Sequence, residues 1–130
     1  LTAVLPVTHP LAKADNLPFE QLRGETFLLF PEHSFINDLC IRECRNAGFE
    51  PHIAYTGNRG ATLIDLVRNG AGITLMMHHS ARQENDSSLA FIPVTPGIYS
   101  YISLNYAKEK PLSPQAESFV RYVKAHKRDF

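Results

Sequence analysis

Short apolar runs of strand length alternate along the chain with longer stretches in which apolar residues recur every three or four positions. Continuous runs such as Thr26–Phe30 and Ile73–Met77 are typical of strands that are buried on both faces. The longer stretches are typical of helices with one face in a core. The predicted strands are Thr2–Val7, Thr26–Phe30, His52–Thr56, Ile73–Met77, Leu89–Val94 and Ile98–Ala107.

Start and stop signals place helices between these strands. Ser34 is a predicted N-cap, and Gly48 and Gly70 each follow a helical stretch, as glycine often does at a helix C-terminus. The predicted helices are Leu17–Leu22, Phe35–Ala47, Ala61–Asn69 and a last one that Ser113 caps and Pro114 begins. On the helix Phe35–Ala47 the residues expected to face outward are Asn37, Asp38, Arg42 and Arg45.

The order of these elements predicts the class of fold. Between Thr26 and Met77 a strand, a loop and a helix follow one another twice before a third strand. Short connections in this order indicate an α/β domain with a parallel sheet and right-handed crossovers. A polar stretch, Arg82–Ser88, separates this part from the last two predicted strands.

A parallel sheet of this kind places the candidate binding site at the carboxyl ends of its strands, where the following helices begin. Two helix N-termini there offer free N–H groups and positive dipole ends to an anion. We therefore expect a small carboxylate or a similar oxyanion to bind there. The candidate residues are His33, Ser34 and Phe35 in the first loop, Gly57, Asn58 and Arg59 in the second, and His78 after the third strand.

Each of these residues also has a purely structural interpretation. Ser34 caps a helix whether or not a ligand binds, and capping alone explains a serine there equally well. Arg59 lies in a loop between glycines and is equally compatible with a solvated side chain. Asn58 tolerates left-handed backbone conformations and fits a tight turn.

Metal binding and catalysis are disfavoured. The pair His78-His79, with His33, Cys40 and Cys44, lacks the ligand spacing of a zinc site. No G-x-S-x-G elbow, glycine-rich phosphate loop or H-E-x-x-H motif occurs. The sequence thus predicts no metal, no cofactor and no catalytic residues.

Charge and cysteine content narrow the function classes further. The 13 basic and 13 acidic residues balance, whereas a nucleic-acid-binding surface usually carries a basic excess. Two cysteines four residues apart on one helix seldom form a disulfide of good geometry and suggest a reduced, cytoplasmic protein. No apolar stretch is long enough to span a bilayer, so no membrane partner is expected.

Several phrases of the sequence resemble the LysR-type transcriptional regulators. The resemblance begins with Val4-Leu5-Pro6 and His9-Pro10-Leu11-Ala12, and continues through Leu17–Glu25, which contains the leucine-arginine-glycine triplet. Thr62–Leu75 (TLIDLVRNGAGITL) is similar to the most recognisable stretch of that family in this region. One departure is Met77, which stands where the family usually has a proline.

The resemblance implies a fold like that of the type II periplasmic binding proteins, with two α/β subdomains around a ligand cleft. Residues 13–95 would form the second subdomain, and residues 1–12 and 96–130 the crossing and returning segments of a partial LysR-type substrate-binding domain. The DNA-binding helix-turn-helix and most of the first subdomain would lie outside these residues. In the family, contacts of the second subdomain come from the positions of Ser34 with its neighbours and of Gly57–Arg59, whereas His78 matches more weakly.

The functional expectation is therefore an effector-sensing module, not an enzyme. A small anionic metabolite would bind in the cleft and rearrange a homodimer or homotetramer, which would contact DNA through the helix-turn-helix alone. An extracytoplasmic solute-binding protein of the same fold class is the alternative. An enzyme on this fold is a third, weaker one.

Overall fold

A computed structural model describes residues 1–82, 86–101, 103–107 and 109–126 of the chain. The chain divides into a unit Leu1–Tyr99 and a unit Ser100–Phe130, and each is described by itself. The first unit contains the strands β1 (Thr2–Pro6), β2 (Leu17–Pro18), β3 (Thr26–Leu29), β4 (His52–Thr56), β5 (Thr74–Met76) and β6 (Leu89–Thr95), with the helices α1 (Phe35–Asn46), α2 (Gly60–Arg68) and α3 (His78–Arg82).

The strands of this unit form a mixed sheet. One ladder has the order β2-β6-β1-β5, and the other pairs β3 with β4. A bridge between Phe27 and Ile73 and the hydrogen bond from the Leu28 N–H to the Ile73 carbonyl (2.9 Å) join the two ladders. Strand β3 runs parallel to β4, and β2 runs parallel to β6, but β1 runs antiparallel to both of its neighbours.

The α/β class is thus confirmed, and β3 runs parallel to β4 and to β5, as predicted for the segment Thr26–Met77. No direction was predicted for β1, which is antiparallel to both of its neighbours. This strand lies between β5 and β6, with Val4 opposite both Thr74 and Phe91. The βαβ pattern of the sequence covers only the segments from β3 to β5, and no helix connects β1 to a parallel neighbour. Its direction therefore depends on long-range pairing and not on a local crossover.

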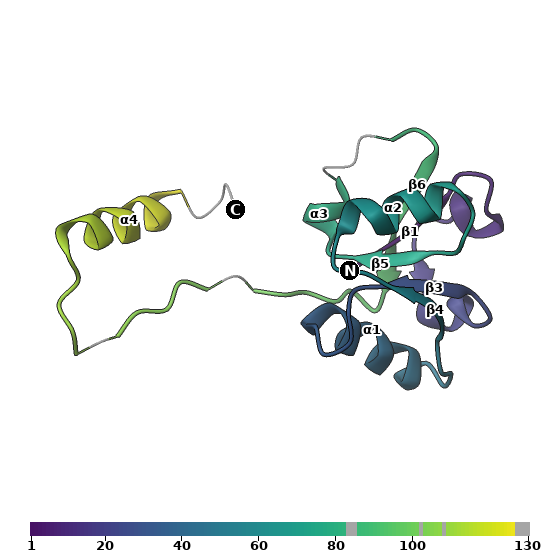
Figure 1. Cartoon of the computed structure of the whole chain (residues 1–130), viewed down its shortest axis with the longest axis horizontal. Helices are drawn as coiled ribbons and strands as arrows, with labels where there is room; N and C mark the ends of the chain where they lie inside the picture. The colour runs from purple at the N-terminus through teal and green to yellow at the C-terminus, as the bar shows by residue number, and fades with distance from the viewer. Residues whose placement is uncertain (83–85, 102, 108, 127–130) are drawn as a thin grey trace. The chain divides into compact units, whose positions relative to one another are not determined.

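Helices cover both faces of the sheet, with α1 on one side and α2 on the other (Figure 1). Residues alternate between the two faces along each strand. Leu5 and Leu75 pack in the cluster that contains Leu39 and Cys40 of α1, whereas Val4 and Met76 pack in the cluster of α2. Because both faces are covered there, the central strands β3 and β5 are largely apolar and buried, which explains the continuous runs in the sequence.

Helix α1 begins as the sequence predicts. Ser34 has an extended backbone, and its hydroxyl accepts a hydrogen bond from the Asn37 N–H at 3.2 Å, which confirms the N-cap. The expectation that Asn37 faces outward is wrong, since this residue is 1% exposed and its Nδ2 donates to the Phe30 carbonyl at 2.8 Å. A first-turn residue can reach back to the strand that precedes the helix, and the helical pattern alone does not show this.

Two short segments differ from the sequence prediction. The segment Leu17–Leu22, predicted as a helix, begins with β2 and continues as the 3₁₀ helix Phe19–Leu22. Helix α3 was not predicted, because its five residues are too few to show an apolar period. Residues 83–85 of the predicted polar stretch lie outside the described part of the chain.

In the second unit the described residues form one helix, α4 (Pro114–Ala125). The Ser113 hydroxyl caps it by accepting from the Ala116 N–H at 3.2 Å, and Pro114 occupies its first turn, as the sequence predicts. The strand predicted over Ile98–Ala107 is not present in the described residues 98–101 and 103–107. A strand needs a partner for its backbone hydrogen bonds. Apart from the bond from the Leu1 amino group to the Ile98 carbonyl at 2.8 Å, no described residue pairs with the backbone of this segment.

Candidate functional site

The carboxyl ends of β3, β4 and β5 meet at one edge of the sheet. The segments that contain the predicted site residues begin there. The Gly57 N–H, just after β4, donates to the carbonyl of Leu29, the last residue of β3, at 3.0 Å. At the start of α2, a Cβ added to Gly60 would lie 3.0 Å from Met76 Cε and 3.8 Å from Phe30 Cζ. The ends of β3, β4 and β5 and the N-terminus of α2 are therefore neighbours.

His33, Ser34 and Phe35 lie in the loop that leads from β3 into α1. His33 adopts a left-handed backbone conformation with φ of 64°, which few residues other than glycine adopt. It ends a turn closed by the hydrogen bond from the Ser34 N–H to the Pro31 carbonyl at 3.1 Å. Phe35, the first residue of α1, is 63% exposed, so a large aromatic side chain is available to a partner or ligand at this edge.

The second predicted loop leads from β4 into α2. Asn58 and Arg59 are exposed, whereas Gly57 is partly buried. Arg59 is the N-cap residue of α2, but no side chain caps this helix, and its first turn contains no acidic residue. In this respect α2 differs from α1, whose N-terminus is closed by Ser34 and carries Asp38 in its first turn.

His78 starts α3 directly after the end of β5. Its Nδ1 forms a hydrogen bond with the hydroxyl of Thr2 at 3.0 Å, and Thr2 is fully buried at the start of β1. Because β1 is antiparallel, its amino end lies at the same edge as the carboxyl end of β5, with Thr2 opposite Met76. The imidazole thus has a structural hydrogen bond in the described chain.

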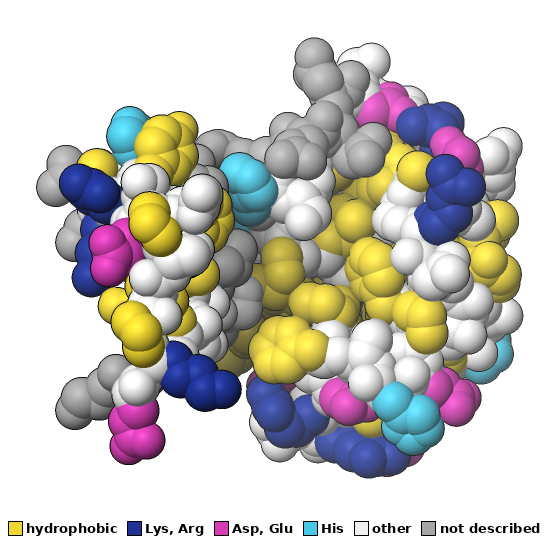
Figure 2. Space-filling view, turned by 60° about the vertical axis from the view of Figure 1, so that its left-hand side comes forward, with side chains coloured by type: hydrophobic (Ala, Val, Ile, Leu, Met, Phe, Trp, Pro, Cys, Tyr) yellow, Lys and Arg dark blue, Asp and Glu magenta, His cyan; other side chains and the backbone are white. Residues whose placement is uncertain are grey.

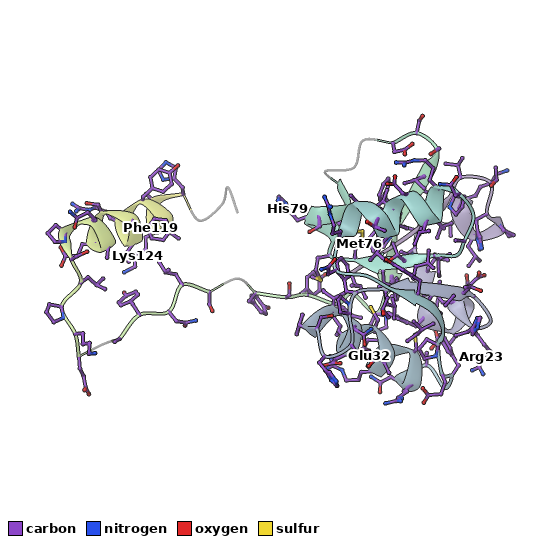
Figure 3. All side chains as sticks on the ribbon, in the orientation of Figure 1. Arg23, Glu32, Met76, His79, Phe119 and Lys124 are labelled. Carbon is purple, nitrogen blue, oxygen red and sulfur yellow. The ribbon has the colours of Figure 1, made fainter. Side chains whose placement is uncertain are left out.

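Met76 lies inside the unit beneath α2, whereas Glu32 lies near α1 and Arg23 at the periphery (Figure 3). Arg23 stacks over the ring of Phe49 at 5.5 Å and donates to the Ala47 carbonyl at 3.3 Å. These contacts hold the C-terminal end of α1 and do not reach the edge where the loops meet.

The cysteines lie in the core under α1. Both are buried, and burial raises the pKa of each thiol to about 12. The thiolate is the reactive form of cysteine, so folding disfavours the reactive form of both Cys40 and Cys44. Among the described residues, no three His, Cys, Asp or Glu side chains are grouped so that they could hold a metal ion.

A hollow with a volume of about 460 Å³ lies beside this edge, between α1 and β4. Of the predicted site residues only His33 lines this hollow. The other residues that line it were not predicted as site residues. No alternation along β4 marks these residues, because four of its five residues are exposed. The lining residues are Glu32, His33, Asn37, Asp38, Ile41, Ile53, Ala54, Tyr55 and Thr56.

Solved structures with the same fold are regulatory domains. The Synechocystis PCC6803 CcmR regulatory domain in complex with 2-PG matches 95% of this chain and 61% of its own, with a TM-score of 0.79 and 17% identity. The effector-binding domain of QuiR in complex with shikimate matches 96% of this chain and 61% of its own, with a TM-score of 0.72 and 21% identity. The fold inferred from the sequence is thus confirmed.

Curated relatives are transcriptional regulators. The dual regulator GltC of Bacillus subtilis is 30% identical over 122 residues, which cover 93% of this chain and 41% of GltC. The regulator TtuA of Agrobacterium vitis is 37% identical over 83 residues, 60% of this chain and 26% of TtuA. The chain therefore spans well under half the length of the curated relatives it matches.

The family model described as "LysR substrate binding domain" matches residues 1–128, which is nearly the whole chain. In the described part of the chain no helix is both long and apolar enough to cross a membrane. The relatives do not favour the alternative of an extracytoplasmic solute-binding protein. This chain belongs to the LysR substrate-binding domain family.

Proposed function

We propose that the chain is the effector-sensing part of a LysR-type transcriptional regulator and that it binds a small anion at the N-terminus of α2. The open N-terminus of α2 carries this proposal. No described residue accepts a hydrogen bond from the N–H of Gly60 or of Ala61, and helix N–H groups left free in this way bind anions. Arg59 adds a positive charge beside them.

The two helix N-termini at this edge are not equivalent anion sites. At α1 the Ser34 hydroxyl already occupies the Asn37 N–H, and Glu32 and Asp38 place carboxylates around the turn. At α2 neither obstacle is present. The anionic group is therefore expected at residues 57–61, while Ser34, Phe35, His33 and His78 would line the same wall with hydroxyl, aromatic and imidazole groups.

The ligands of solved regulatory domains with a similar fold support the proposal of an anionic effector. The solved neighbours include CcmR with 2-PG, QuiR with shikimate and BenM with benzoate, and shikimate and benzoate are carboxylates. An acid held at the α2 N-terminus would have its charge matched by the helix dipole and by Arg59. Which acid is bound would be decided by the rest of the wall.

In this proposal the domain works within a larger regulator. The effector would favour one arrangement of a homodimer or homotetramer, and DNA would be bound by a helix-turn-helix outside these 130 residues, in the cytoplasm. No chemical conversion of the effector is part of this role, in keeping with relatives that are transcriptional regulators.

Binding measurements on the regulator that contains this domain test the proposal. A panel of small carboxylates and phosphate esters is screened for a rise in melting temperature, and the best ligand is titrated. We expect Arg59→Gln to weaken its binding about tenfold, because about 1.4 kcal/mol of charge-assisted hydrogen bonding is lost.

The matched control is Arg42→Gln, which removes the same charge from the exposed face of α1. The control is expected to bind the ligand as the unmodified protein does. If no acid raises the melting temperature, or if Arg59→Gln binds as tightly as the control, the α2 terminus is not the anion site.

A further inference from the structure

The hollow between α1 and β4 has a chemistry opposite to that of the α2 terminus. Among its lining residues are the acids Glu32 and Asp38 but no lysine or arginine. Both acids are exposed, and neither forms an ion pair with a described residue. An anion would be repelled from this hollow, whereas a cation would find two uncompensated carboxylates.

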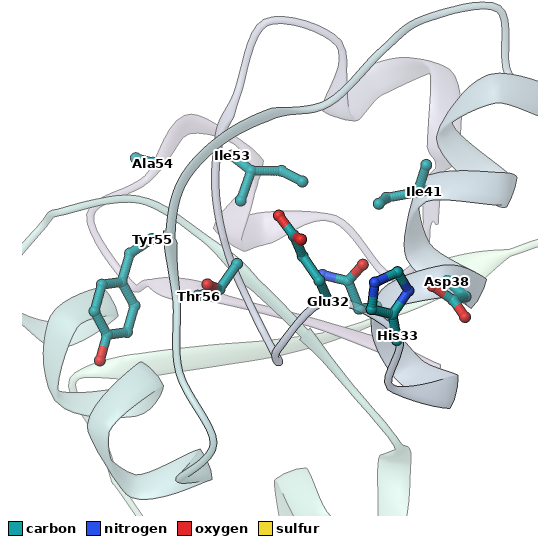
Figure 4. Close-up of a pocket in the computed structure, with 9 residues that line it drawn as sticks. Glu32, His33, Asp38, Ile41, Ile53, Ala54, Tyr55 and Thr56 are labelled. Atoms are coloured by element: carbon teal, nitrogen blue, oxygen red, sulfur yellow. The ribbon is translucent and has the colours of Figure 1, made fainter.

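Two aliphatic side chains lie beside these acids in the hollow. Ile41 points into the hollow from α1, and Ile53 points toward it from β4 (Figure 4). The carboxylate of Glu32 rises between them from the loop below. A ligand that enters here meets two aliphatic walls and a carboxylate at once, while the ring of Tyr55 points away from the hollow.

Asn37 supplies a further acceptor that is already oriented. This residue lines the hollow and is 1% exposed, and its Nδ2 donates to the Phe30 carbonyl at 2.8 Å. That bond fixes the orientation of the carboxamide, because a carbonyl oxygen accepts only from the nitrogen. Its Oδ1 receives no hydrogen bond from a described residue and is not fully buried, so it is free to accept a hydrogen bond from a ligand.

We propose that this hollow binds an organic cation with a short aliphatic stem, an alkylammonium or alkylguanidinium group. The charged head would donate hydrogen bonds to Glu32, Asp38 and the Asn37 Oδ1, and the stem would lie between Ile41 and Ile53. Long cationic side chains combine an apolar stem and a polar head in this way. The site is separate from the anion site proposed above and does not depend on it.

The proposal is tested by titrating the folded protein with n-butylguanidinium. Calorimetry and backbone amide chemical shifts measure the binding. Saturable binding is expected, with shifts at residues of α1 and β4. The double variant Glu32→Gln and Asp38→Asn keeps the side-chain shapes and is expected to weaken binding at least tenfold. Asp15→Asn, which removes a carboxylate that forms no ion pair with a described residue, is expected to bind normally.

Two further ligands separate the contributions of charge and stem. Butanol has the stem without the charge, and unsubstituted guanidinium has the charge without the stem. Both are expected to bind at least tenfold more weakly than n-butylguanidinium. Equal binding of butanol would overturn the proposal, as would normal binding of n-butylguanidinium by the double variant whose circular dichroism shows it to be folded.

The same chemistry can come from a free amine or from an arginine side chain of another polypeptide. N-acetyl-arginine amide, compared with n-butylguanidinium, distinguishes these sources. Tighter binding of the arginine derivative would support a polypeptide source, and tighter binding of n-butylguanidinium would support a free metabolite. Failure of both to bind saturably would refute the cation site, and would leave the anion site at α2 unaffected.

Discussion

At the scale of single residues, two buried threonines differ in whether their hydroxyl groups have a hydrogen-bond partner. Thr2 and Thr74 are both fully buried in neighbouring strands. The Thr2 hydroxyl is bonded to His78 at 3.0 Å, whereas the Thr74 hydroxyl has no hydrogen-bond partner in the described chain. Burying a hydroxyl without a partner costs free energy, so the two side chains contribute to stability with opposite signs.

Replacing Thr74 by valine is therefore expected to stabilise the protein. Thr74→Val exchanges the unpaired hydroxyl for a methyl group of similar size and should raise the free energy of unfolding by about 1 kcal/mol. Thr2→Val is the matched comparison and should lower it by about 1 kcal/mol, because it leaves His78 without its partner. Urea denaturation followed by circular dichroism measures both, and a loss of stability in Thr74→Val would contradict the expectation.

Another residue, His33, shows how a local conformation shapes the candidate sites. Its left-handed backbone reverses the chain so that Ser34 can cap α1. The same turn places the side chains of Glu32 and His33 at the hollow beside α1. One short loop thus contributes to the cap, to the edge of the proposed anion site and to the proposed cation site.

At the scale of elements, an ion pair between Arg68 and Asp86 ties α2 to the turn before β6. Arg68, at the end of α2, forms ion pairs with Asp65 and with Asp86. Hydrogen bonds from the hydroxyl and the backbone of Ser88, followed by that from Arg68, lower the pKa of Asp86 to about 2. The folded chain therefore favours the ionised form of Asp86 more than the unfolded chain does.

This shift predicts how stability depends on acidity. A carboxyl whose pKa is lowered by folding stabilises the protein above its unfolded pKa, near 4, and loses this effect as the pH falls toward 2. Asp86→Asn should therefore destabilise the protein at pH 7, and the difference from the unmodified protein should shrink between pH 4 and pH 2.

Melting temperatures of the two proteins across this range provide the measurement. Asp15→Asn again controls for the removal of one negative charge. A difference between Asp86→Asn and the unmodified protein that persists unchanged at pH 2.5 would show that the ionised carboxylate is not what stabilises the turn.

The helices also show at this scale how two similar sequence signals differ in their free hydrogen-bond donors. Both α1 and α2 follow a strand and begin at the same edge of the sheet, yet Ser34 caps α1 with its hydroxyl, whereas Arg59 at the same position of α2 makes no capping hydrogen bond. A capped terminus has its own acceptor, and an uncapped one keeps its donors for another group. The sequence placed the two loops on equal terms, and the hydrogen bonds distinguish them.

For the whole molecule, exposed aromatic residues of the C-terminal part are the main feature outside the sheet. Hydrophobic side chains lie on the surface in both units of the chain (Figure 2). In the segment from residue 99 onward, large apolar side chains are exposed in a series, whereas monomeric proteins usually expose them singly. The exposed aromatic residues from this part are Tyr99, Tyr101, Tyr106, Phe119 and Tyr122.

We therefore expect the 130-residue chain to self-associate as its concentration rises. Sedimentation velocity should show an average mass that increases with concentration. Tyr101→Ser combined with Phe119→Ser should reduce this increase. Val7→Ser, which changes a single exposed apolar residue just after β1, should not. A concentration-independent monomer would contradict this expectation.

The sequence alone determined the α/β class, the helix N-caps and most of the strands. Ser34 and Ser113 are local signals, because a cap depends on a side chain and on backbone N–H groups three residues away. The strands β3 and β5 could be recognised because a sheet covered on both faces selects continuous apolar runs. The family resemblance likewise depended on the order of short phrases along the chain.

Only the tertiary structure decided the direction of β1, the burial of Asn37 and the hollow beside α1. The pairing of β1 joins residues far apart in the sequence, such as Val4 and Thr74, and no local period encodes it. Asn37 is buried because its carboxamide meets the carbonyl of Phe30, seven residues earlier, across a turn. Contacts of this kind depend on how the elements pack. The proposed cation site is therefore not encoded locally, since residues of both α1 and β4 line its hollow.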